Sequence, residues 1–186
     1  MSNLEIKMTP LPGLVLINRK RHDDKRGFLN RIFCQKELGE AGWSTPVNQI
    51  NYTMTMGKGT VRGLHYQLPP SAEMKLVTCI KGEIWDVAVD VREDSTTFLK
   101  WHAEPLGFKN NCSLLIPPGF AHGFQVISDE AEIIYLHSAA YDQERERGLN
   151  PLDKSLKINW PLPVAMMSEK DSAHEYINEN FQGVIL

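Results

Sequence analysis

The chain has 186 residues, 42% of them hydrophobic and 23% charged, which is the composition of a soluble globular protein with room for a sizeable core. Its formal net charge of −3 gives no reason to expect a nucleic-acid partner, no window is apolar for long enough to span a bilayer, and the N-terminus lacks the apolar segment of a signal peptide. The three cysteines, Cys34, Cys79 and Cys112, are an odd number and lack the Cys-x-x-Cys spacing. We therefore expect no disulfide framework, and we expect the protein to work in the reducing cytoplasm.

The first part of the chain predicts two strands and one short helix. The apolar run at residues 14–17 suits a strand, and residues 28–33 suit another after a turn-like segment. Residues 35–41 predict a short helix that Gly42 ends. Since the sequence shows neither a repeat nor a linker, we expect one domain over residues 1–186.

From about residue 47 the pattern changes to short strands separated by Gly, Pro, Asn and Asp. Lys81 and Gly82 predict a hairpin turn between two of them. A loop-like segment with three prolines follows, and Ser168 then marks the start of a helix that runs toward Phe181. The expected strands are residues 75–80, 83–91, 98–106, 112–116, 122–127 and 131–139. So many short strands with little helix predict an all-β sandwich or jelly-roll barrel with short peripheral helices, and the mouth of such a barrel is a common ligand site.

A cluster of polar side chains marks the expected strand at residues 62–67. His65 shares one strand face with Gly63, three residues after Arg62 and ten before Lys75. Alone, a histidine in a strand is more often structural, and a lysine at a strand start is usually solvated. Polar groups gathered in a barrel strand, however, need a ligand or a network to offset their desolvation. An imidazole, an ammonium and a guanidinium together suit a reaction in which a base removes a proton beside a carbonyl and cations stabilise the enolate.

Pro117, Gly119 and His122 form a second histidine motif. Its Pro-x-Gly-x-x-His spacing resembles the second metal-ligand motif of the cupin barrels, in which the histidine points inward. The first cupin motif requires His-x-His followed by a glutamate, whereas this chain has a single histidine, His65, at that place. Because two histidines without further ligands make a poor metal site, we expect a cupin-type barrel that holds no metal.

Three further candidates each have an ordinary structural explanation. Tyr135 lies in an expected strand and Tyr141 just after it, where tyrosine normally serves packing. Asp171 follows Ser168 at the spacing of a capping box, so on the residues alone its carboxylate serves the start of a helix. These three residues gain a chemical role only from a resemblance to a known family.

The motifs occur together in a known order and spacing. Residues 62–67, 75–77, 117–124 and 168–171 closely resemble those of the dTDP-4-dehydrorhamnose 3,5-epimerase family of sugar-nucleotide enzymes, and the similarity runs from about residue 10 to residue 175. The resemblance implies a cupin jelly roll without metal or redox cofactor, usually a homodimer that exchanges strands between its subunits. It also implies inversion beside the C4 ketone of a nucleotide-linked 4-keto-6-deoxyhexose, in the synthesis of a deoxysugar such as dTDP-rhamnose for a surface polysaccharide or natural product.

The resemblance also implies a catalytic role for five residues. His65 would be the base that removes the proton from C3 or C5, and Asp171 would hydrogen-bond the far nitrogen of its ring and fix its tautomer. Lys75, helped by His122, would stabilise the enolate oxygen. Tyr135 would return a proton on the opposite face of the sugar, which turns deprotonation into inversion.

Nucleotide contacts are implied by the same resemblance: Arg26 and Arg62 for the diphosphate, Gln49 and Asn51 on the wall of the site, and Phe28 and Tyr141 against the base. Arg31 departs from the pattern, since the family usually has a glutamate at this place that helps to hold the thymine. An arginine inverts that charge, so a CDP-linked or other NDP-linked sugar is an alternative to a thymidine-linked substrate.

Three alternatives to a 3,5-epimerase stay open. The first is an enzyme of related chemistry, either an epimerase that inverts only C3 or only C5 or a 3,4-ketoisomerase. Ketoisomerases on this fold generally use paired histidines and lack a lysine at the place of Lys75, which favours epimerisation. A metal-dependent cupin oxygenase is disfavoured by the missing His-x-His pattern. A non-catalytic barrel that binds sugar nucleotides has no need of the acid–base pair that His65 and Tyr135 provide.

Overall fold

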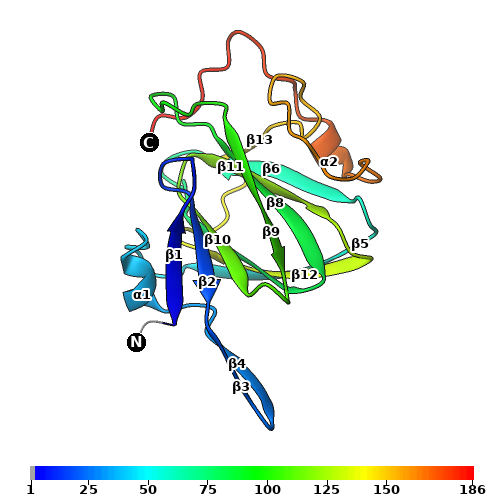
Figure 1. Cartoon of the computed structure of the whole chain (residues 1–186). Helices are drawn as coiled ribbons and strands as arrows, with labels where there is room; N and C mark the ends of the chain where they lie inside the picture. Colours follow the sequence, from blue (N-terminus) through cyan, green and yellow to red (C-terminus); the bar gives the residue numbers. More distant parts are fainter. Residues whose placement is uncertain (1–2) are drawn as a thin grey trace.

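The computed structural model describes residues 3–186, which form two large antiparallel sheets, a two-stranded hairpin and two short helices (Figure 1). The six-stranded sheet has the order β1 (Leu4–Met8), β2 (Val15–Arg19), β10 (Cys112–Ile116), β7 (Lys75–Lys81), β12 (Glu130–His137) and β5 (Gln49–Met56). The five-stranded sheet has the order β13 (Glu146–Gly148), β6 (Val61–Gln67), β11 (Phe120–Val126), β8 (Glu83–Asp90) and β9 (Trp101–Gly107). The hairpin pairs β3 (Arg21–Asp24) with β4 (Gly27–Asn30).

The two large sheets pack on each other through one apolar core. Val77 and Ile133 of the six-stranded sheet belong to the same buried cluster as Ala88 and Phe124 of the five-stranded sheet. Two antiparallel sheets with a shared core are the arrangement of jelly rolls. The prediction of an all-β protein of the cupin-type jelly-roll class with short peripheral helices is therefore confirmed.

Each large sheet is also covered on its outer side. Leu38 of α1 (Gln35–Gly39) and the nearby Trp43 pack with Leu76 and Leu115 of the six-stranded sheet. The outer side of the five-stranded sheet is covered by the C-terminal part of the chain, which contributes Leu149, Leu156 and Val184 to a cluster with side chains of β6 and β8. Strands buried on both faces read as nearly continuous apolar runs, as those of β7 and β8 do.

The strands expected after residue 47 are found within a few residues of their predicted bounds. The largest difference is β9, which begins at Trp101 instead of residue 98. Just before it, the hydroxyls of Ser95 and Thr97 donate hydrogen bonds to the buried carboxylate of Asp90, so this segment turns back on itself. Polar residues that a neighbouring carboxylate can hold favour a turn over a strand.

The predicted C-terminal helix running toward Phe181 is wrong in length, because α2 comprises only Glu169–Ser172. The Asn150 side-chain amide donates to the carbonyl oxygens of Ser172 and His174, both at 3.1 Å. The Asp153 carboxylate accepts the backbone N–H of Ile177. Side chains from a distant loop therefore take the backbone groups that a longer helix would need.

The hairpin β3–β4 projects from the body of the molecule at the end opposite α2 (Figure 1). The strand expected at residues 28–33 ends at Asn30, and part of the segment interpreted as a turn is paired as β3. Phe28 and Leu29 in its second strand are 50% and 71% exposed. Such apolar exposure on a projecting hairpin is typical of a contact surface.

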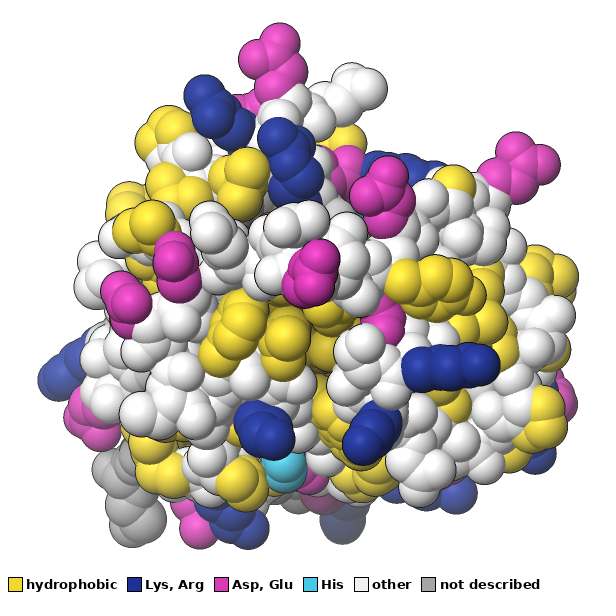
Figure 2. Space-filling view, turned by 90° about the horizontal axis from the view of Figure 1, so that it is seen from above, with side chains coloured by type: hydrophobic (Ala, Val, Ile, Leu, Met, Phe, Trp, Pro, Cys, Tyr) yellow, Lys and Arg dark blue, Asp and Glu magenta, His cyan; other side chains and the backbone are white. Residues whose placement is uncertain are grey.

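The face seen from above in Figure 2 has no extended patch of positive or of negative charge. Hydrophobic, acidic and basic side chains are interspersed over it. This agrees with the small net charge of −3. Among the described residues, no helix has the length and apolar character needed to cross a bilayer.

Candidate active site

A cavity of about 390 Å³ lies between the two large sheets, next to α2. Its lining comes from β6 and β11 on one side and from β5, β7 and β12 on the other, so the two sheets face each other across it. Cavities of this size suit a small polar ligand. All five residues predicted to be catalytic line this cavity: His65, Lys75, His122, Tyr135 and Asp171.

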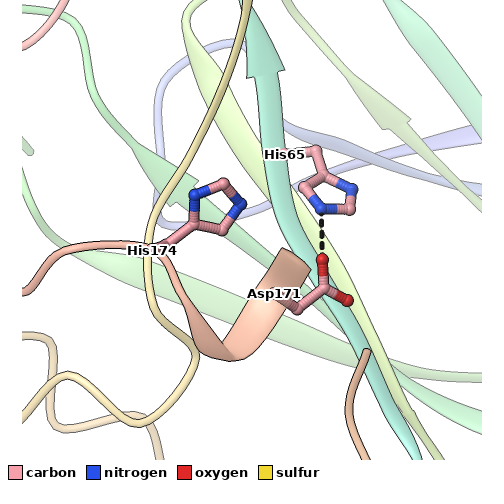
Figure 3. Close-up of side chains that lie close together, drawn as sticks. All are labelled: His65, Asp171 and His174. Carbon is pink, nitrogen blue, oxygen red and sulfur yellow. Dashed lines mark hydrogen bonds and ion pairs between the residues drawn. The ribbon is translucent and has the colours of Figure 1, made fainter. Parts of the chain in front are cut away.

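His65 of β6 and Asp171 of α2, which both line the cavity, form a close polar contact (Figure 3). Nε2 of His65 lies 2.6 Å from Oδ1 of Asp171, whose side chain is only 4% exposed. Oδ2 of Asp171 accepts the backbone N–H of Gly63 at 3.2 Å. Burial opposes ionisation of this carboxyl, but the hydrogen bonds from His65 and Gly63 outweigh it and lower the pKa of Asp171.

The start of α2 explains how Asp171 reaches His65. The Ser168 side chain caps the helix by accepting the Asp171 backbone N–H at 3.0 Å. The interpretation of the Asp171 carboxylate as a helix cap is therefore wrong, because Ser168 provides the cap and the carboxylate points to β6. An ionised carboxylate accepts only, so it fixes the proton of neutral His65 on Nε2 and leaves the lone pair of Nδ1 to receive a proton.

Lys75, at the start of β7, is held by buried partners instead of solvent. Its Nζ donates to the His65 carbonyl oxygen at 3.2 Å and lies 2.9 Å from Oε1 of Glu73. Glu73 is only 7% exposed and also accepts a hydrogen bond from Gln67. A buried, paired ammonium beside the base supplies positive charge to the cavity without being screened by water.

His122 lies directly opposite His65 in the pairing of β11 with β6. Its Nε2 is 2.7 Å from Oδ1 of Asp86, a fully buried residue of β8. Burial raises the pKa of Asp86, although the nearby His122 opposes that shift. Two histidines of the cavity lining are thus each held by a carboxylate, His65 by Asp171 and His122 by Asp86.

Tyr135 reaches the cavity from β12, in the sheet opposite His65. Its ring centroid lies 6.1 Å from that of His122 and 6.1 Å from that of His137. Burial raises the pKa of the Tyr135 hydroxyl, so this group stays protonated well beyond neutral pH. Burial also lowers the pKa of His137 to about 4, which keeps that ring neutral.

The rim of the cavity carries further polar groups. Arg62 of β6 donates from Nε to the Thr55 hydroxyl at 2.7 Å, which leaves its terminal nitrogens for a ligand. The Tyr141 hydroxyl donates to Glu146 at 2.7 Å, and Lys170 lies 2.5 Å from the same carboxylate oxygen. Gln49 accepts the Tyr141 backbone N–H at 2.8 Å and donates to Asn51 at 3.1 Å.

Within the described chain, His65, Asp171 and His174 form a group with the donor atoms of a metal site, each with one such atom within 4.8 Å of the others. The His174 ring lies 5.9 Å from the His65 ring. Two imidazoles and a carboxylate are ligands that Zn²⁺ accepts.

Comparisons with known proteins decide the family. The family model for dTDP-4-dehydrorhamnose 3,5-epimerase matches residues 8–179. A dTDP-4-dehydrorhamnose 3,5-epimerase of Shigella flexneri is 44% identical over 169 residues, which cover 90% of this chain and 93% of that protein. The chain belongs to the dTDP-4-dehydrorhamnose 3,5-epimerase family. The prediction made from the sequence motifs is therefore confirmed, and the chain is an isomerase of the epimerase class.

Solved structures of the epimerase family agree with this fold. The dTDP-6-deoxy-D-glucose-3,5-epimerase of Legionella pneumophila, in complex with dTDP-4-keto-L-rhamnose, is 36% identical, with a TM-score of 0.90 over 98% of this chain and 99% of that one. A 3'-monoepimerase of Streptomyces bikiniensis, in complex with dTDP-quinovose, is 30% identical, with a TM-score of 0.83 over 90% of this chain and 85% of that one. Among the alternatives stated above, neither a single-centre epimerase for a CDP-linked or other NDP-linked sugar nor a metal-dependent oxygenase is favoured.

The predicted site residues of the epimerase divide into two groups in space. Gln49, Asn51, Arg62 and Tyr141 line the same cavity as the five predicted catalytic residues. The other three lie on or beside the hairpin β3–β4 and do not line it: Arg26, Phe28 and Arg31. Arg26 pairs with Asp24 and has a side chain 90% exposed, whereas Arg31 pairs with Glu37 at 2.5 Å.

The sequence motifs did not indicate several residues of the epimerase cavity. Glu73, Glu146 and His137 line the cavity, and Asp86 supports His122 from the next strand. Asp86 alternates with the buried Ile84 and Ala88 on one face of β8, and a carboxylate on such a face needs a partner. This signal was present in the sequence. Glu146, by contrast, lies in a loop-like segment rich in charged residues, where the sequence pattern does not distinguish a functional carboxylate from a solvated one.

Proposed function

We propose that the protein inverts C3 and C5 of a dTDP-linked 4-keto-6-deoxyhexose, by removing a proton from each carbon and returning one to the opposite face. The observation that supports this most is the 2.6 Å contact between His65 and Asp171 in the cavity lining. A histidine whose Nε2–H is held by a buried carboxylate has its Nδ1 lone pair available as a general base and gains stabilisation when it becomes an imidazolium.

The charge that develops on the C4 oxygen of the substrate has two candidate partners. Lys75 is a buried ammonium fixed by Glu73, and His122 is an imidazole fixed by Asp86. Preorganised donors of this kind lower the energy of an enolate more than that of the ketone. Tyr135, which belongs to the opposite sheet from His65, would then donate its proton to the far face of the carbanion.

For the nucleotide we propose a thymidine diphosphate. Both solved relatives described above carry dTDP-sugars. The positive charge of Arg31 suggested a nucleobase other than thymine. The Arg31 guanidinium, however, pairs with Glu37 at 2.5 Å, and this carboxylate offsets part of that charge. Arg62 at the cavity rim would hold diphosphate oxygens, and Tyr141 would lie against the base. The product would enter deoxysugar synthesis of the dTDP-rhamnose type in the cytoplasm.

We also propose that the working form is a homodimer. The hairpin β3–β4 projects from the body with Phe28 and Leu29 exposed, and three predicted contact residues lie on it or beside it, outside the chain's own cavity. The edge strand β5 presents an exposed apolar stripe, with Ile50 63% and Met56 66% exposed. A partner that covered this stripe and received the hairpin would bury both surfaces.

Proton NMR in D₂O with dTDP-4-keto-6-deoxyglucose tests the proposed reaction. We expect deuterium at both C3 and C5 and an inverted product. Exchange at one carbon alone would restrict the enzyme to a single centre, and exchange only with a CDP-linked sugar would overturn the nucleotide assignment. A His65→Gln variant serves as the control, because it retains a polar side chain but has no basic nitrogen.

Native mass spectrometry tests the proposed dimer. We expect a mass of two chains for the wild type and weaker association for Phe28→Ser, which removes an exposed apolar ring from the hairpin. A monomer at assay concentration with full epimerase activity would contradict the proposal.

A further inference from the structure

His174 lies beside the proposed base without a role in the proposed reaction. Its ring packs edge to face on that of His65, with an angle of 71° between the planes. Its Nε2 is buried and has no hydrogen-bond partner in the described part of the chain. In Figure 3 one nitrogen of this ring points toward the His65–Asp171 pair. A buried nitrogen without a partner costs free energy, so it indicates a site for a further ligand.

Gly148 of β13 makes room for this ring. It pairs with His65 across the β6–β13 ladder, and a Cβ at position 148 would collide with Nε2 of His174. Asn150 meanwhile holds the His174 backbone by donating to its carbonyl oxygen at 3.1 Å. The position of His174 is thus fixed by contacts from the end of β13 and from the segment that follows it.

The three side chains together offer the donor set of a zinc site with an open position. His65, Asp171 and His174 each have one suitable atom within 4.8 Å of the others. Zinc bonds of about 2.0–2.2 Å place ligand atoms about 3.4 Å apart. Bringing His174 closer and opening the 2.6 Å contact between His65 and Asp171 would reach that spacing.

We propose that His65, Asp171 and His174 form an inhibitory site for Zn²⁺. This inference rests on the proposed role of His65 as the base. Zinc bound to Nε2 of His65 replaces the proton on that nitrogen, and the neutral ring then carries its proton on Nδ1. Since Nδ1 is the nitrogen that must accept the substrate proton, the metal switches off the base without entering the reaction.

Zinc titration of the deuterium-exchange activity, with His174→Phe as the decisive variant, tests this inference. Phenylalanine keeps a flat ring over Gly148 but has no ligand nitrogen. We expect Zn²⁺ to inhibit the wild type reversibly, with activity restored by EDTA. The half-inhibitory concentration should rise at least about tenfold in His174→Phe, each protein being compared with its own zinc-free rate. Mg²⁺, which prefers oxygen ligands, should not inhibit.

Direct binding gives a readout that does not depend on activity. Calorimetry with Zn²⁺ and visible absorption of bound Co²⁺ should show a site that His174→Phe loses. His102→Phe is the matched control, because His102 forms another histidine–carboxylate pair, 2.8 Å from Glu104 on β9, and its loss should leave the site intact.

Equal inhibition of the wild type and His174→Phe would identify an adventitious ion elsewhere and overturn the inference, as would the absence of zinc binding. In both cases the proposed epimerase reaction would stand. Zinc that binds through His174 without slowing exchange would also overturn the inference, and the role of His65 as the base would still be tested separately by His65→Gln.

Discussion

Asp171→Asn tests whether this carboxylate sets the tautomer of His65. Both carboxylate oxygens accept hydrogen bonds, Oδ1 from Nε2 of His65 and Oδ2 from the backbone N–H of Gly63. An asparagine has only one acceptor oxygen. If that oxygen stays with Gly63, the NH₂ group faces His65, Nε2 must accept, and the ring proton moves to Nδ1. The reverse orientation sets the NH₂ group against the N–H of Gly63, which is less favourable.

The expected loss is large because the wrong tautomer has no base. The equivalent substitution in a Ser-His-Asp triad lowers turnover about 10⁴-fold. The His65 side chain is 31% exposed, so water can still help it to change tautomer. We therefore expect a loss of about 10³-fold, or about 4 kcal/mol in activation free energy.

The assay is the initial rate of deuterium entry at C3, followed by NMR in D₂O. Ser168→Ala is the control, since it removes the cap that accepts the Asp171 N–H and should cost about 1 kcal/mol of unfolding free energy while leaving the tautomer unchanged. A folded Asp171→Asn enzyme whose rate stays within about tenfold of the wild type would refute the tautomer argument.

Three further predictions concern the opposite wall of the cavity. Lys75→Met should lower the exchange rate by about 10²-fold, because an enolate stabiliser is lost, and an unchanged rate would remove Lys75 from the mechanism. Tyr135→Phe should let deuterium enter the substrate without inversion, as NMR coupling constants would show, and normal inversion would assign the acid elsewhere. Burial lowers the pKa of His137 to about 4 from 6.5, so the unfolded chain binds a proton that the folded chain excludes, and stability falls as the pH drops from 6.5 toward 4. His137→Phe should recover up to about 2 kcal/mol of the unfolding free energy lost between pH 7 and pH 4.5, measured by urea titration. An equal pH dependence of the two proteins would contradict this.

The fold was readable from the sequence where local patterns decide it. Short apolar runs bounded by Gly and Pro located the strands from β7 to β12, and burial on both faces strengthens this local signal in β7 and β8. α2 was misjudged because its end is decided by Asn150 and Asp153, which lie far from it in the sequence. No local pattern reports that a distant amide takes the carbonyl of Ser172.

The site was readable only in part for a similar reason. The five proposed catalytic residues stand in motifs that resemble a known family, and all of them line one cavity. The supporting partners carry no such motif, because their role depends on which strands are neighbours. Asp86 meets His122 only since β8 pairs with β11, and Glu73 meets Lys75 only through the bend that precedes β7.

The two-sheet architecture itself suits inversion of a carbon centre. Inversion needs a base on one face of the sugar and an acid on the other, held in place at the same time. His65 belongs to the five-stranded sheet and Tyr135 to the six-stranded sheet, so the cavity walls supply the two groups from opposite sides. The surroundings of the two groups also differ. A carboxylate accepts a hydrogen bond from His65, whereas burial raises the pKa of the Tyr135 hydroxyl. The proposed base is thus stabilised when it gains a proton, and the proposed acid keeps its proton until a carbanion, a much stronger base than water, forms within reach.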